Sequence, residues 1–199
     1  GTTATLNVEK LILSTRDSSL NFIAHSSLLK TMGYEIKNLE IEEDYFQDNL
    51  NGHFTIDHFK NPYSNFSEID LNLKTFEKNS VLADFSSTID AVSEKLIFGL
   101  QFENRNDTVT FKFQDQKEIR LGKKYWHLLE NKGFKITESG DFLGGLLKIE
   151  NEKQQIELQS TEGQFKMQVD QLNFGALYNF ILNDSSLSAS ADLALSYNF

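Results

Sequence analysis

The 199-residue chain has no cysteine and a single proline, Pro62. The missing thiols exclude disulfides, iron–sulfur clusters, thiolate zinc sites and cysteine nucleophiles. Because proline cannot donate a backbone hydrogen bond to a strand ladder, its scarcity suits a chain built from strands. Basic residues are also few: 19 Lys and Arg stand against 29 Asp and Glu, a formal net charge of -10. No basic stripe is present to neutralise phosphates, so we expect no nucleic-acid partner.

Long hydrophobic runs are absent as well. No stretch of about 18 apolar residues is available to span a bilayer as a helix. Residues Gly1 to Thr5 lack the basic and apolar regions of a signal peptide. The chain begins with glycine rather than methionine, so we interpret residues 1–199 as a single elongated segment excised from a longer chain. Any anchor or export signal is then expected outside this segment.

Motifs for catalysis and metal binding are missing. The sequence has no phosphate loop, no G-x-S-x-G elbow and no H-E-x-x-H pair. The spacing of His53 and His58 places them on opposite faces of a regular strand, which disfavours a shared metal. The acidic run 42–44 is interpreted as a solvated edge or loop, and Gly144-Gly145 as a β-bulge or a close backbone approach. We therefore predict a protein that is not an enzyme and has no cofactor or metal.

Aromatic residues are abundant, with 17 Phe and 6 Tyr, and they favour pleated, half-buried surfaces. Apolar and polar residues alternate in many segments; in 96–102, Leu or Phe occupies every second position. Such alternation predicts strands with one apolar and one wet face. The residues predicted to share one apolar, lipid-accessible face are Leu71, Leu73, Phe98, Leu100, Phe102, Val109, Phe111, Phe113, Ile119 and Leu121.

Short polar segments separate the predicted strands. Residues 103–107, 138–141 and 150–153 contain Asn, Asp or Gly, which suit turns. Short turns predict an all-β, mainly antiparallel meander. Only residues 173–182 have helical spacing, so at most one or two short helices are expected. Further strands are predicted at 5–13, 18–30, 35–41, 52–59, 81–89, 134–136, 146–149, 155–159, 164–172 and 188–197, the first and last of them with unpaired edges.

Periodicity alone leaves the use of the apolar face open. A sheet that closes on itself or packs against a second sheet makes the face an ordinary core, whereas an open trough makes it a channel for acyl chains. Two other classes also remain. The final segment, Ala191 to Phe199, resembles the closing strand of an outer-membrane β-barrel. A secreted adhesin-like or ligand-binding β-sandwich is the third.

The order of motifs in residues 120–199 carries a resemblance. The order begins with a Trp that precedes a strand with a central Ile. A second strand ends in Asn, and a strand with the pattern Q-x-I-x-L follows it. A further strand and then a segment of small residues complete the order. Ser160 and Ala189 stand where Gly is common. The motif residues are Trp126-His127-Leu128, Glu130-Asn131, Phe134-Lys135-Ile136, Leu146 to Ile149, Asn151, Gln155 to Ser160, Gln164 to Leu172, Asn173-Phe174 and Ser188 to Leu193. This order resembles the TamB branch of the AsmA-like family; residues 1–119 resemble it only in style.

The resemblance implies a fold, a location and partners. The family folds its β-sheet into an elongated apolar trough, or β-taco, within a bridge protein of the bacterial periplasm. The parent protein is anchored in the inner membrane and reaches an Omp85-type partner in the outer membrane. The implied role is non-catalytic: lipid transfer between the membranes, or support of outer-membrane protein assembly. Lipid acyl chains and neighbouring β segments of the same chain are the other implied partners.

Overall fold

The computed structural model describes residues 5–16, 19–31, 33–62, 64–90, 93–105, 107–137, 139–161, 164–173 and 190–198. These residues form an all-β protein, and every strand pairing in it is antiparallel. The predicted fold class is confirmed in this respect. The segment predicted as a short helix, 173–182, lies outside the described residues except for Asn173.

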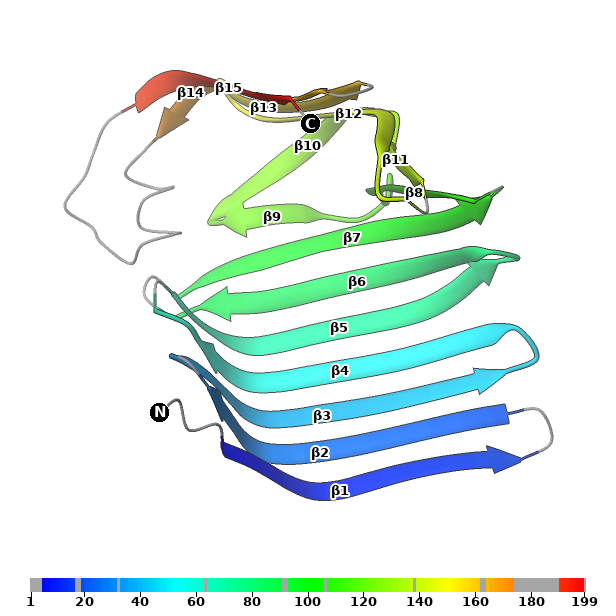
Figure 1. The fold of residues 1–199 in the computed structure, drawn as a ribbon. Helices are drawn as coiled ribbons and strands as arrows, with labels where there is room; N and C mark the ends of the chain where they lie inside the picture. The colour runs from blue at the N-terminus through cyan, green and yellow to red at the C-terminus, as the bar shows by residue number, and fades with distance from the viewer. Residues whose placement is uncertain are drawn as a thin grey trace.

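One sheet contains all fifteen strands of the part of the chain that the structure describes. The first seven follow each other as a meander, and the later strands turn away from them (Figure 1). The strands are β1 (Thr5–Arg16), β2 (Ser19–Thr31), β3 (Tyr34–Phe46), β4 (Asn49–Lys60), β5 (Asn65–Glu77), β6 (Ser80–Ile89), β7 (Glu94–Arg105), β8 (Thr108–Phe113), β9 (Ile119–Gly122), β10 (Lys124–Asn131), β11 (Phe134–Thr137), β12 (Phe142–Asn151), β13 (Gln154–Thr161), β14 (Gln164–Asn173) and β15 (Ser190–Asn198).

The strands of the first half are longer than alternation predicted. The segment 35–41 grows to the thirteen residues of β3, and 52–59 to the twelve of β4. The acidic run 42–44 lies inside β3, paired on both sides, so its interpretation as an edge or loop is wrong. Its carboxylates still reach water, because Glu42 and Asp44 are exposed while Glu43 is half-buried. The predicted terminal strands are confirmed: β1 and β15 stand at the two ends of the strand order.

A row of residues near one end of β3, β4 and β5 interrupts the two-residue alternation. Asn38, Asp57 and Glu68 are exposed, and the ladder skips them while it continues on both sides. Asn38 and Glu68 have positive φ angles of 50° and 51°. The Asn38 side chain donates to the carboxylate of Asp57 at 2.7 Å. We call these three residues the bend row, since the strands turn near this end in Figure 1.

The bend row keeps apolar side chains on one face of the sheet, although their spacing along the sequence changes there from two residues to three. In β3, half-buried Ile36 and Leu39 flank exposed Lys37 and Asn38. A residue with positive φ bends the strand locally, and one extra residue in the alternation resets which face the next side chain occupies. Beyond the row, the rings of Tyr34, Phe59 and Phe66 follow one another at centroid distances of 6.4 and 6.3 Å.

The second half departs from a simple meander at β7, whose two ends pair with different strands. Residues Leu100–Arg105 pair with β8, and Lys95–Ile97 pair with β9. Strand β10 begins against β9 and then pairs with β12, so it crosses diagonally between the two parts of the sheet (Figure 1). As a result, β12–β14 lie over the β8–β9 end of the sheet, and a core forms between them.

An asparagine side chain at the end of β10 forms hydrogen bonds to the end of β8. Asn131 accepts from the backbone N–H of Phe113 at 3.2 Å and donates to the carbonyl of the same residue at 2.7 Å. Its amide also donates to Asp115 at 2.8 Å. These bonds satisfy backbone groups that a neighbouring strand would otherwise pair. Asn151, another residue of the resemblance, donates to the Tyr125 carbonyl at 2.6 Å and ties β12 to β10.

Glycines make the corner where β12 changes partners. A Cβ atom on Gly145 would lie 2.7 Å from the Cα of Phe134 and 2.8 Å from the carbonyl oxygen of Gly133. Gly144 has a φ of 152°, and the pairing of β11 with β12 shifts register beside it. The predicted bulge or close backbone approach at Gly144-Gly145 is confirmed, and both features occur.

Candidate functional site: the apolar face

Cross-strand pairing places the predicted lining residues on one face of the sheet. Directly paired residues share a face, and three rows run across the strands through such pairs. The rows are Phe54, Leu71, Phe85 and Phe98; then Leu73, Ala83, Leu100 and Phe113; then Val81, Phe102, Phe111 and Phe134. Leu121 pairs with Leu96, which alternates with Phe98, and Val109 pairs with Asn104. We call this surface the apolar face.

Aromatic rings make continuous contacts along the apolar face, across the strands rather than along them. Phe98 stacks on Phe85 with ring centroids 4.9 Å apart and contacts Phe113 at 5.9 Å. Phe111 stacks on Phe134 at 5.2 Å and contacts Phe102 at 6.4 Å. Rings at these separations attract each other beyond the effect of burial alone. The face therefore offers a rigid aromatic surface.

Packing against the buried core cluster divides the predicted lining residues into two groups. Ile119 is only 3% exposed and belongs to the core cluster with Trp126, Phe134, Leu147 and Ile149. Phe111, Phe113 and Leu121 are half-buried and pack against that cluster. By contrast, Leu71, Leu73, Phe98, Leu100 and Phe102 are half-buried in the single-layer part of the sheet, and Val109 is exposed. We call the first group the covered end and the second the open stretch.

The sequence missed residues that complete this face. Phe85 lies in a predicted strand and alternates with Ala83 and Val81, but the predicted set of lining residues does not include it. Phe54 was likewise in a predicted strand and pairs with Leu71. Phe134 closes one aromatic row at the covered end, and no local pattern in its short strand indicates that contact. Toward β3 the row of Leu73 meets a carboxylate, because Gly52 pairs with Glu43, while the row of Phe54 continues through Ile41.

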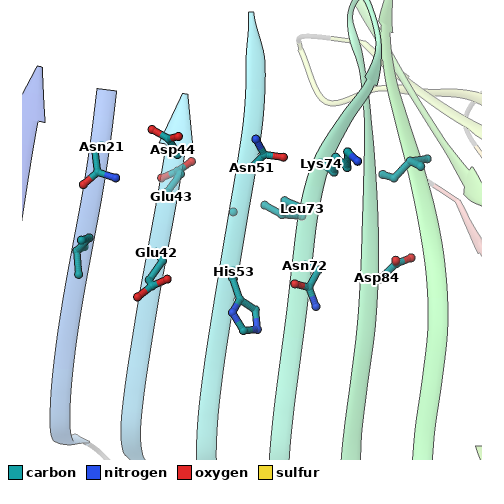
Figure 2. Close-up of a pocket in the computed structure, with 13 residues that line it drawn as sticks. Asn21, Glu42, Glu43, Asp44, Asn51, His53, Asn72, Leu73, Lys74 and Asp84 are labelled. Carbon is teal, nitrogen blue, oxygen red and sulfur yellow. The ribbon is translucent and has the colours of Figure 1, made fainter. Parts of the chain in front are cut away.

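The opposite face is polar and carries a hollow. It has a volume of about 500 Å³. Side chains of Glu42, Asp44, His53, Asn72 and Asp84 stand around it on neighbouring strands (Figure 2). In the described part of the chain, no group of three His, Asp or Glu side chains gathers closely enough to hold a metal ion. This surface therefore offers acidic side chains in an open, wet setting.

Ion pairs on the polar side connect neighbouring strands. His53 lies 3.0 Å from Asp70, while His58 pairs with Asp90 at 3.2 Å, so the two histidines have separate partners. Hydrogen bonds from Lys95 and Thr88 hold the pKa of Glu68 below its usual 4.5. Those from Lys30 and Lys37 lower the pKa of Glu35 in the same way. These exposed pairs order the surface but contribute little stability individually.

The lowered pKa of Glu68 predicts a specific acid sensitivity. A carboxyl group with a lower pKa in the folded state stabilises the fold above pH 4.5 and loses that contribution as pH falls through the folded value. We expect Glu68→Gln to reduce the fall in melting temperature between pH 6 and pH 3, by a small amount because the group is exposed. Glu42→Gln is the control. Identical pH profiles for the wild type and Glu68→Gln would contradict the role of this pair.

Comparison with known proteins gives no relative: no family model, no curated protein and no solved structure matches the chain. Within the described ranges there is also no helix long and apolar enough to cross a membrane. The site is therefore interpreted from its own geometry.

Proposed function

We propose that this chain is a non-catalytic segment of a periplasmic bridge protein that holds lipid acyl chains on its apolar face. The observation that carries the proposal is the open stretch, where aliphatic and aromatic side chains remain half-buried on a single-layer sheet. Soluble monomers rarely leave a continuous apolar surface of this kind without a partner. Acyl chains fit because they offer no hydrogen-bonding groups, and the rows between Phe54 and Phe102 contain no charged side chain.

The wider setting follows the resemblance to the TamB branch of the AsmA-like family. We propose that the parent protein is anchored in the inner membrane and contacts an Omp85-type partner in the outer membrane. The apolar face then forms part of a trough for lipid transfer, or supports outer-membrane protein assembly. An antiparallel meander with an apolar and a polar face supports this proposal. Among the described residues, strands β1 and β15 are each paired on one side, which leaves edges for neighbouring β segments.

A charge placed in the open stretch tests acyl-chain binding. We expect Leu71→Asp to weaken binding of a pyrene-labelled fatty acid by about tenfold to a hundredfold, because burying a leucine side chain contributes roughly 1.5–3 kcal/mol. The fold should persist, since Leu71 is only half-buried and water can reach the new carboxylate. Fluorescence titration measures the affinity, and circular dichroism checks the strand content.

Asn51→Asp is the matched control for this experiment. Asn51 is exposed on the polar face of the neighbouring strand β4, so it introduces the same carboxylate away from the apolar face. Its affinity for the labelled fatty acid should equal that of the wild type. Equal binding by wild type and Leu71→Asp, with both folded, would reject the apolar face as the binding site.

A further inference from the structure

The apolar face is open over β4–β7 and at Val109 of β8, and it is covered at Phe111 and Phe113 of β8 and over β9. At the covered end, Trp126, Phe134, Leu147 and Ile149 are 8%, 6%, 4% and 4% exposed. They come from β10, β11 and β12. Strand β11 continues the sheet beside β8, and beyond it the sheet turns so that β12 lies over the face together with β10 (Figure 1). The aromatic row that begins at Phe102 continues through Phe111 into Phe134 and on to Phe165 of β14, at 6.4 Å. The surface that would carry an acyl chain therefore runs directly into a packed core.

We propose that this core is a stop for the hydrocarbon chain, so that the segment binds acyl chains only along its open stretch. The inference rests on the proposed function and concerns the same face. An acyl chain lying across the strands on Phe85 and Phe98 next meets the ring of Phe113, a residue of the neighbouring row that packs against the covering core. To go further it must displace side chains that already bury one another. Breaking that packing exposes apolar side chains that the core now buries, so entry of the chain has a cost that binding on the open stretch does not have.

Two contacts that do not belong to the open stretch hold the stop in place. The absence of a side chain at Gly145 allows β12 to approach Phe134, and the side chain of Asn131 holds the end of β10 against Phe113. Both contacts are local and short. The stop is therefore built into the corner of the sheet, and passage requires that β12–β14 separate from β8 and β9.

Site-specific photo-crosslinking tests the proposal. The 199-residue chain carries p-benzoylphenylalanine at position 98, 111 or 101 and is irradiated with phosphatidylethanolamine–phosphatidylglycerol vesicles that contain tritiated acyl chains. We expect strong lipid labelling at Phe98 and background labelling at Phe111. Gln101 gives the background, because it alternates with Leu100 and Phe102 and so points to the polar face. Thermal melting confirms that each variant is folded, and Leu121 replaces Phe111 as the covered position if that variant unfolds.

The outcomes separate the two proposals. Labelling at 98 and 111 to the same extent, in folded variants, overturns the stop but retains acyl-chain binding. Labelling at neither position overturns the proposed function itself. Crosslinks at position 98 to a second copy of the chain, with no lipid adduct, show that the open stretch is a protein interface and also reject the proposal.

Discussion

Phe134→Ala is expected to lower the free energy of unfolding by about 3–5 kcal/mol, the usual cost of removing a buried phenylalanine side chain. Phe134 is 6% exposed and stacks on Phe111 of β8 with ring centroids 5.2 Å apart. Its ring also contacts Phe165 of β14. One side chain thus joins the first part of the sheet to the strands that cross over it. Urea unfolding followed by circular dichroism measures the loss.

Leu143→Ala provides the comparison for this substitution. Leu143 lies in β12, close in sequence to the corner, but is 48% exposed. Its truncation leaves no internal cavity, so the unfolding midpoint should stay close to that of the wild type. Similar losses of stability in the two variants, or no loss in either, would contradict this prediction. The core between β8–β11 and β12–β14 would then not be what holds β12–β14 over the rest of the sheet.

Gly145→Ala should destabilise the protein by about 1–3 kcal/mol or more, the usual cost of forcing extra atoms into a packed region. The added Cβ would lie 2.7 Å from the Cα of Phe134 and 2.8 Å from the carbonyl of Gly133, and backbone atoms cannot rotate away as side chains do. The expected result is a lower melting temperature, with loss of Phe134 packing visible in the near-ultraviolet circular dichroism.

Gly52→Ala is the corresponding control. Gly52 also lies in a strand and is buried, whereas Gly145 is half-buried. The nearest obstacle to a Cβ on Gly52 is the end of the Phe54 ring at 3.2 Å, a side chain that can move by a few tenths of an ångström. We expect a much smaller change in melting temperature. Equal effects of the two substitutions would mean that any added methyl group in a strand is costly, and that the corner is not special.

Alternation predicted the strands and the face because both depend on short-range geometry. Successive side chains of a strand point to opposite sides, so Leu96, Phe98, Leu100 and Phe102 had to share a face in any regular strand. The acidic run 42–44 was misassigned for a related reason. Three carboxylates in a row resemble a loop, but in β3 only Glu43 points to the apolar face, while Glu42 and Asp44 project into water.

Features that depend on distant residues were not predictable. The bend row uses Asn38 and Glu68 at positive φ, where glycine would be the expected signal. The covered end depends on the contact of Phe134 with Phe111 and on the close approach of Gly145 to Phe134, and both join residues of different strands. The sequence does not indicate that β10 crosses from β9 to β12, so the prediction treated the lining residues as one continuous set. The structure separates them into open and covered groups.

The bend row also determines how this sheet could grow. Asn38, Asp57 and Glu68 occupy matching positions on adjacent strands, so β3, β4 and β5 each change the facing of their side chains at the same place. Deleting one of these residues from a single strand would shift the side chains beyond it to the wrong face. Duplication of a whole hairpin, in contrast, copies the position of the bend together with the strands. A sheet of this design can therefore lengthen by two strands at a time and keep one uniform cross-section.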